Sequence, residues 1–221
     1  MLFQLLSNPT PLTFLIFLLF AVGVIIAITV HEFAHAASAE KLGDPTAKVH
    51  NRVSLNPLNH LDPIGTLLIF LVGFGWGKPT PFDPYNLKNP KKDSAIISLA
   101  GPASNLILAV LFTIPFWIGA ILQNSFLTSF SELLSPIVRI NIILAIFNLI
   151  PIHPLDGFKI LGGFLPREWY NDWMATERYG IILLIALLFI PIAGGSSLLS
   201  QIIGPVVGQI LNLLYLGQIP F

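Results

Sequence analysis

The chain has 221 residues, of which 54% are hydrophobic and only 10% are charged, and its mean hydropathy is +0.80. A soluble domain carries about 25% charged residues, so this composition excludes a water-soluble enzyme, a disordered tail and a nucleic-acid-binding module. The 11 basic residues balance the 11 acidic ones, and the absence of cysteine excludes disulfides, zinc–thiolate sites, iron–sulfur clusters and thiol nucleophiles.

Several apolar runs are candidates for membrane-spanning helices, because a helix needs about 20 mostly apolar residues to cross the hydrocarbon core of a bilayer. These runs are Leu12–Val30, Ala95–Leu122, Leu133–Ile152, Gly180–Ala193 and Leu198–Leu216. We expect Gly101-Pro102 and Pro115 to break the second run. The shorter run Ile64–Gly75 is followed by glycines and prolines, which indicates a re-entrant or β-hairpin membrane segment near residues 64–82. The predicted fold class is an all-α polytopic membrane protein with about five to six transmembrane helices.

The distribution of basic residues predicts the orientation of the chain in the membrane. All of them except Arg139 lie between the first and second apolar runs or between the third and fourth. The loops on the opposite side, residues 123–136 and 194–197, contain none. Since basic residues gather on the cytoplasmic side, we expect the two basic loops to be cytoplasmic and the segment 64–82 to return to the side that it left.

The first apolar run leads directly into His31-Glu32-Phe33-Ala34-His35. On a continuing helix, His31 and His35 lie one turn apart and can present two imidazole nitrogens to one metal ion, with Glu32 beside them. Zinc peptidases use this arrangement of two ligands and a carboxylate base. The alternative is a hydrated helix end with an ordinary cluster of acidic and imidazole groups, although such a cluster is costly at a membrane helix end.

A hydrolytic zinc site needs a third protein ligand and an open position for water. Asp156 is the best-placed candidate, because it closes the segment Asn148–Gly157 at the predicted cytoplasmic end of the third apolar run, at the depth of His31 and His35. Prolines in this segment prevent a regular helix, and irregular backbone at membrane depth is tolerated where it is buried in protein or lines a wet cavity. The alternative is an aspartate that caps a helix in a proline-rich turn.

Three stretches carry a resemblance to a known family: His31–His35, Asn148–Gly157 and Ala100–Asn105. Together with the linker Asn56–Pro63 and the stretch Gly75–Asp93, they resemble the site-2 proteases, which are intramembrane zinc metalloproteases, in the compact bacterial or archaeal form without appended domains. The resemblance covers about residues 20–165. It implies one zinc ion per chain, with His31, His35 and Asp156 as ligands and Glu32 as the catalytic base.

The resemblance also has implications for substrate binding. It implies that Asn148 helps to position the substrate and that Gly75–Pro81 belongs to a membrane-entering hairpin near the cleft. Asn105 is a second candidate for substrate binding, because an amide in an apolar run needs a partner; its alternative role is a hydrogen bond between helices. Site-2 proteases usually have proline where this chain has His153, so His153 is a possible competing ligand three residues before Asp156.

The predicted function is that of an intramembrane zinc metalloprotease, which cleaves peptide bonds in or near transmembrane segments during regulated intramembrane proteolysis. We expect a transmembrane protein or peptide substrate, no nucleic acid, and a multi-pass location in the cytoplasmic membrane of a prokaryote, with the active site towards the cytoplasm. Residues 1–221 are expected to form a single membrane-embedded metalloprotease domain, with a catalytic core at about 12–165 and two further spans at about 176–217.

Two other classes of function are open to a metal-binding membrane protein. The first is a transporter or assembly factor that binds a metal without hydrolysis, because transporters also use interrupted spans with polar residues. The second is a di-iron oxidase or desaturase, which would need more histidines than the five in this chain.

Overall fold

The computed structural model describes residues 6–72, 75–190 and 197–218. These residues form helices and no strand, apart from one isolated antiparallel bridge between Leu61 and Gly77, which confirms the predicted all-α class. The helices are α2 (Pro11–Leu42), α3 (Thr46–Val49), η1 (Pro57–Asn59), α4 (Pro63–Val72), η2 (Pro84–Asn86), α5 (Pro90–Ile121), α6 (Ser125–Leu133), α7 (Ser135–Asn148), α8 (Asp156–Phe164), α9 (Arg167–Ala175), α10 (Glu177–Phe189) and α11 (Leu198–Leu214).

Among the described residues, two helices are long and apolar enough to cross a membrane, namely α2 and α5. The pair α6 and α7, bent by 49°, adds a third if it forms one broken span, and α11 is apolar but shorter. The predicted five to six transmembrane helices are therefore not confirmed. The predicted span Gly180–Ala193 corresponds to α10 up to Phe189, and its residues 191–193 lie outside the described part of the chain.

Helix α2 begins and ends at well-defined caps. Thr10 and Thr13 form a reciprocal capping box at its start, and Gly43 ends it with φ 105°, a left-handed conformation that glycine adopts without strain. No cap interrupts the helix between these points, so it continues past the apolar run through His31 and His35. The predicted metal-ligand motif His31–His35 therefore lies inside a continuous helix.

The expected break in the second apolar run is wrong. Helix α5 continues through both Pro102 and Pro115. Proline removes one hydrogen bond from a helix, but membrane helices tolerate it because neighbouring helices and hydroxyl side chains compensate the freed carbonyl group. As a result, α5 is a single rod that passes the metal-ligand motif of α2.

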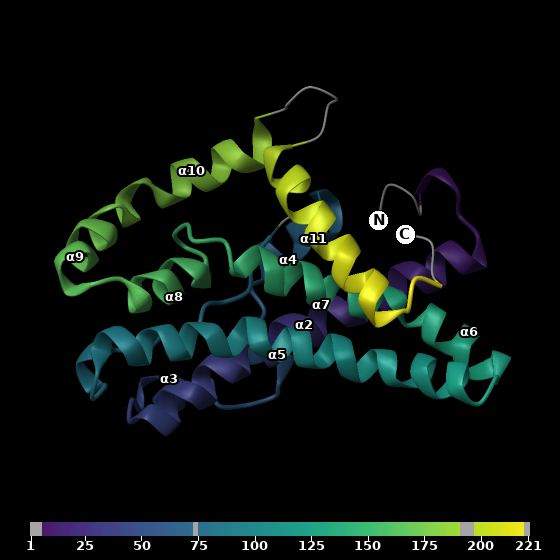
Figure 1. Ribbon diagram of the computed structural model, residues 1–221, viewed down its shortest axis with the longest axis horizontal. Coiled ribbons are helices and arrows are strands. Elements are labelled where there is room, and N and C mark those ends of the chain that lie inside the picture. The colour runs from purple at the N-terminus through teal and green to yellow at the C-terminus, as the bar shows by residue number, and fades with distance from the viewer. Residues whose placement is uncertain (1–5, 73–74, 191–196, 219–221) are drawn as a thin grey trace.

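Helix α5 is the centre of the packing and contacts α2, α6, α7 and α8 (Figure 1). Helix α2 also packs against α7, so α2, α5 and α7 form the inner bundle. The chain then leaves α8 through α9 and α10, and α11 returns to pack against α7. The candidate site lies where α2, α5 and the beginning of α8 meet.

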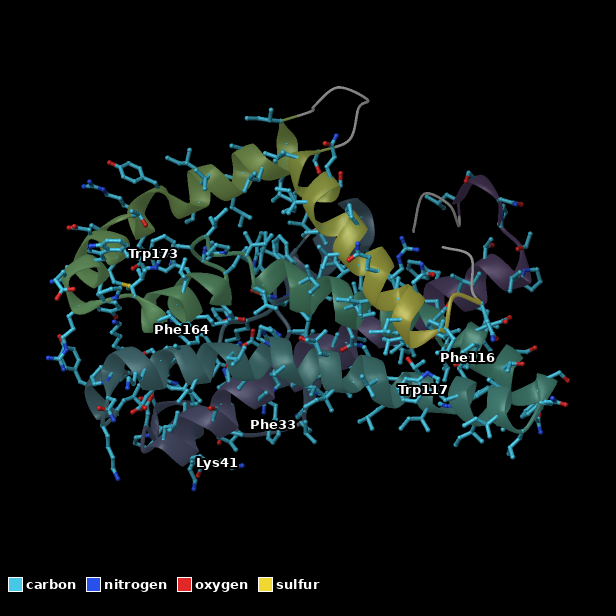
Figure 2. All side chains as sticks on the ribbon, in the orientation of Figure 1. Phe33, Lys41, Phe116, Trp117, Phe164 and Trp173 are labelled. Carbon is cyan, nitrogen blue, oxygen red and sulfur yellow. The ribbon has the colours of Figure 1, made fainter. Side chains whose placement is uncertain are left out.

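A separate apolar cluster holds the other half of the bundle together. Phe116 of α5 meets Tyr215 edge to face, with ring centroids 5.1 Å apart, and the indole N–H of the neighbouring Trp117 donates to the Leu214 carbonyl at 2.6 Å (Figure 2).

Helix α10 exposes large apolar side chains such as Ile181 and Ile182, with 56% and 69% of their surface exposed. Such a surface suits contact with lipid.

The two ends of the segment predicted to be re-entrant, residues 64–82, lie side by side in the structure. The segment contains α4 and then a stretch without regular secondary structure, and its residues 73–74 lie outside the described part of the chain. The Lys78 N–H donates to the His60 carbonyl at 2.7 Å, next to the bridge between Leu61 and Gly77. These contacts bring both ends of the segment together beside α2. The entry of the segment into a membrane stays a prediction.

Asp44 ties the end of α2 to the loop before α5. Its side chain is fully buried and accepts hydrogen bonds from the Thr46 N–H and hydroxyl, the Asp83 N–H at 2.7 Å and the Asn86 amide at 2.8 Å. Burial would raise the pKa of Asp44, but the hydrogen bonds outweigh burial and hold it below its ordinary value. The ionised form is therefore the one that stabilises the fold.

We expect Asp44→Asn to destabilise the protein by about 2 kcal/mol near neutral pH, because hydrogen bonds to a charged group are lost. Since folding lowers this pKa, the stabilisation is present above the unfolded pKa of about 3.9 and is lost as the pH falls through the lower folded value. Thermal unfolding in detergent should show a gap in apparent Tm between the two proteins at neutral pH that closes below about pH 4. Asp172→Asn, at an exposed residue, is the control. Equal unfolding temperatures at neutral pH would contradict this role.

Candidate metal centre

His31 and His35 point to one place because α2 is continuous between them. Both residues are buried, with 5% and 7% of their surface exposed. Their Nε2 atoms lie 3.0 Å apart, and their rings meet edge to face with centroids 4.6 Å apart. Two buried imidazoles at this spacing can bind one metal ion together, as the motif predicts.

Asp156 joins the two histidines from a distant part of the chain. Its Oδ2 lies 3.1 Å from Nε2 of His31 and 3.3 Å from Nε2 of His35. A Cβ at Gly157 would lie 2.3 Å from the Leu149 carbonyl oxygen, so only glycine allows the segment after α7 to fold back this tightly. This turn brings the carboxylate to the level of the imidazoles.

The donor set fits a divalent metal ion. Ligand atoms of His31, His35 and Asp156 all lie within 4.8 Å of one another, and the pairwise distances are 3.0–3.3 Å. Zinc ligands at about 2.0–2.1 Å in a tetrahedron are separated by about 3.3 Å, so the observed spacing of the three side chains fits residues that would hold one zinc ion. The structure thus brings together the three residues predicted as ligands.

The electrostatics of Asp156 suit a ligand. Burial would raise the pKa of this carboxyl group, but the imidazoles of His35 and His31, when protonated, outweigh burial and hold the pKa below its ordinary value. Metal binding takes the ionised carboxylate together with the neutral imidazoles.

The far sides of the imidazoles are held by acceptors on α5. Nδ1 of His31 lies 2.6 Å from Oδ1 of Asn105, and Nδ1 of His35 lies 2.7 Å from the Ile97 carbonyl oxygen. The Asn105 amide nitrogen donates to the Ala27 carbonyl at 3.0 Å and to Oδ1 of Asn141 at 2.9 Å, which orients its oxygen towards His31. Both Nδ1 atoms therefore carry the proton and leave Nε2 free to bind a metal.

The sequence left two roles open for Asn105, substrate binding and a hydrogen bond between helices, and did not assign Asn141. In the structure both side chains are fully buried and bond within the helix bundle, and Asn105 lies behind His31. The signal that could have found this pair is the occurrence of one amide in each of two apolar helices that pack together, since such amides seek each other in a membrane protein.

Gly101 of α5 lies directly against the ligand atoms. A Cβ at this position would lie 2.5 Å from Nε2 of His35 and 2.6 Å from Nε2 of His31. Real Cβ atoms essentially never approach that closely. Gly101 therefore leaves the space in which the two imidazoles and a metal ion can meet.

Glu32 lies next to the three clustered residues but is not one of them. One of its carboxylate oxygens, Oε2, accepts a hydrogen bond from the Thr80 N–H at 2.8 Å, and the Thr80 hydroxyl donates to the Glu32 main-chain carbonyl at 3.0 Å. The segment after α4 therefore covers the carboxylate predicted to be the base.

Two other predicted residues lie apart from the clustered ligands. The Asn148 amide nitrogen donates to the Leu144 carbonyl of its own helix at 2.9 Å, and its side chain is half-buried, so its predicted contact with substrate stays a prediction. Nδ1 of His153 lies 3.4 Å from a carboxylate oxygen of Glu177, and its ring packs edge to face on Phe158. His153 thus faces α10 and is not among the clustered ligands.

An apolar cavity of about 560 Å³ lies between α2, α7 and α11. Ala27 and Ile28 of α2, which precede His31 by one turn, form part of its wall, and Gly204 and Gly208 of α11 face it from the opposite side. Arg139 contributes a cation to the lining. A cavity of this size, whose wall includes the α2 turn before His31, can accept apolar side chains.

Comparisons with known proteins agree with this chemistry. The model of "Peptidase family M50" matches residues 115–191, a segment that contains Asp156. "Putative zinc metalloprotease YwhC" of Bacillus subtilis is 37% identical over 196 residues, which cover 87% of this chain and 89% of the relative. The chain belongs to peptidase family M50. A second relative, "Putative zinc metalloprotease Rip2" of Mycolicibacterium smegmatis, is 30% identical over 82% of this chain and 71% of its own length. No solved structure matches.

Membership of family M50 confirms the site-2 protease resemblance. The protein is a zinc-dependent metalloendopeptidase with apolar helices that suit a membrane. The alternative classes, a transporter or assembly factor and a di-iron enzyme, are not supported by these relatives.

Proposed function

We propose that this M50 protein is an intramembrane protease that hydrolyses peptide bonds in or near transmembrane segments of other proteins, as in regulated intramembrane proteolysis. The observation that carries the proposal is the convergence of His31, His35 and Asp156 within 4.8 Å inside a bundle of apolar helices. We further propose that the chain is one multi-pass domain, that it binds one zinc ion, and that the site faces the cytoplasm.

Three side chains would hold zinc, namely His31, His35 and Asp156. Zinc bound there would act as a Lewis acid on the scissile carbonyl and lower the pKa of a water molecule towards about 7. Glu32, beside the ligands, takes a proton from the attacking water and later passes it to the leaving amine; positioned acid–base help of this kind is worth about 10²–10⁴-fold in rate. Asn105 and the Ile97 carbonyl keep the imidazoles in the tautomer that binds metal.

The substrate has to expose a peptide bond that its own helix would protect. An extended substrate strand can pair with an exposed edge of the enzyme, which satisfies its freed backbone groups. The segment Gly77–Pro81 lies over Glu32. Its Lys78 and Thr80 N–H groups are bonded to His60 and Glu32, and its Lys78 and Pro79 carbonyls to Arg52, so a substrate would pair with it through its remaining carbonyl groups. The half-buried Asn148 could add an amide contact, and the apolar cavity between α2 and α11 could accept neighbouring side chains.

Metal removal tests the proposed function. We expect the purified protein to contain about one zinc ion per chain and to cleave a model substrate with a single transmembrane span in detergent or liposomes. A chelator should abolish cleavage, and zinc but not magnesium should restore it, because two imidazoles are poor ligands for magnesium. Zinc-free protein that cleaves the substrate at the full rate would overturn the proposal.

A further inference from the structure

The buried arginine of the loop after α3 makes contacts that the proposed mechanism does not yet use. We propose that Arg52 is a positioning residue that aims the Thr80 N–H at Glu32 and so fixes the carboxylate of the base. This inference rests on the proposed function, since it assigns a support to the proposed base.

The contact between Thr80 and Glu32 is specified by the local sequence. Thr80 stands between Pro79 and Pro81, which have no backbone N–H, so Thr80 holds the single backbone donor of this tripeptide. That donor is used on Oε2 of Glu32 at 2.8 Å. The bond leaves the other carboxylate oxygen available to a water molecule.

Arg52 holds the same peptide group from its opposite end. Its guanidinium donates to the Pro79 carbonyl at 3.1 Å, and the Pro79 carbonyl and the Thr80 N–H belong to one planar peptide unit. In a trans peptide these two groups point in opposite directions. A guanidinium that fixes the carbonyl therefore fixes the direction of the N–H, which is the direction of Glu32.

The guanidinium has no other evident purpose in the described part of the chain. Arg52 is only 5% exposed and forms no ion pair there; besides Pro79, it donates to the carbonyls of Lys78, at 3.1 Å, and Asn59. Burial of a charge without a paired carboxylate is costly. Its planar fork suits several carbonyls at once, which a lysine cannot match.

The backbone of Arg52 is itself held by a hydrogen bond, so the side chain that carries the guanidinium starts from a fixed position. Its N–H donates to the Ala47 carbonyl of α3 at 2.8 Å. The receiving segment is secured separately, because the Lys78 N–H donates to the His60 carbonyl at 2.7 Å. The two anchored pieces meet at the peptide between Pro79 and Thr80, one hydrogen bond away from Glu32.

The test measures zinc content, kcat and KM for Arg52→Gln against wild type on the model substrate. We expect kcat to fall by about 10–100-fold, KM to change by less than about 3-fold and zinc to remain bound, because a misplaced base impairs the chemical step. Arg52→Lys should recover part of the loss, since one ammonium can still reach one carbonyl. Arg167→Gln, at an exposed residue of α9, is the matched control.

Thr80 provides a second pair of variants in case Arg52→Gln folds poorly. Thr80→Pro removes the N–H donor while Arg52 stays, and we expect the same loss of kcat with zinc retained. Thr80→Val keeps the N–H and removes the hydroxyl, so it should lose less activity than Thr80→Pro. If both Thr80 variants lose the same activity, the N–H has no special role and the inference is wrong.

The outcomes separate this inference from the proposed function. If wild type binds zinc and cleaves while Arg52→Gln retains wild-type kcat, Arg52 does not position the base. Loss of zinc together with kcat in both Arg52→Gln and Thr80→Pro would also overturn it, because the segment would then support the metal ligands. A rise in KM with unchanged kcat would mean that the segment binds substrate only. Failure of wild type to bind zinc or cleave would instead overturn the proposed function.

Discussion

Glu32→Gln is expected to keep zinc bound and to reduce kcat by about 10²–10⁴-fold. Glu32 is not among the clustered ligands, so its replacement leaves all three proposed zinc ligands in place. The glutamine amide has nearly the same shape as the carboxylate, and its oxygen can still accept the hydrogen bond from the Thr80 N–H. The change therefore removes the basic group and little else.

Zinc content by elemental analysis and single-turnover cleavage of the model substrate measure this effect. His31→Ala is the companion variant, because it should lose both zinc and activity when a ligand is removed. Rapid cleavage by Glu32→Gln would show that another group takes the proton from water. Loss of zinc from Glu32→Gln would place Glu32 among the metal ligands instead.

Gly101→Ala is expected to reduce zinc affinity by at least about 100-fold and to abolish activity with it. The added methyl group would lie 2.5–2.6 Å from the Nε2 atoms that are proposed to bind the metal. The imidazoles cannot simply turn aside, because their Nδ1 atoms are held by Asn105 and the Ile97 carbonyl. In most membrane helices a change from glycine to alanine is mild, so a large effect here would be specific to the site.

Gly204→Ala is the matched control for zinc binding and folding only, because Gly204 lies within an apolar helix, a Cβ there would meet nothing within 4 Å, and the residue lines the cavity proposed for substrate. Zinc titration of the two variants and a comparison of their elution from a sizing column separate loss of the site from loss of the fold. A Gly101→Ala protein that binds zinc as tightly as wild type would mean that the helices can move apart at this point.

The proposed ligands could be identified from the sequence because each depends on a local rule. Helical spacing fixes the relation of His31 to His35, and the apolar run before them fixes their depth. Asp156 follows from the end of another apolar run at the same predicted depth. Shared depth made Asp156 the best-placed candidate, the resemblance to site-2 proteases implied it as the third ligand, and in the structure the three residues lie together.

The contacts around the ligands could not be predicted in the same way. The partner of Nδ1 of His31 depends on how α5 is rotated against α2, and the sequence expectation of a break at Pro102 removed the regular helix from which that rotation could be estimated. The reach of Arg52 to Pro79 depends on the path of a loop that returns beside its own start. Loop paths follow from many weak long-range contacts, which single-sequence patterns do not encode.

The number of spans shows a different limit. Apolar composition predicted five to six crossings, but α7, α10 and α11 are each shorter than a full crossing requires. Apolar composition shows whether a segment suits lipid. The length of a helix depends instead on the residues that end it, such as the prolines that follow Asn148 at the end of α7.

The proposed ligands come from positions 125 residues apart, and this separation has a consequence for biosynthesis. When only α2 has been synthesised and inserted, the chain contains His31 and His35 but not yet Asp156, the third proposed ligand. Hydrolytic competence therefore arises late, after the turn at Gly157 has been synthesised and folded back.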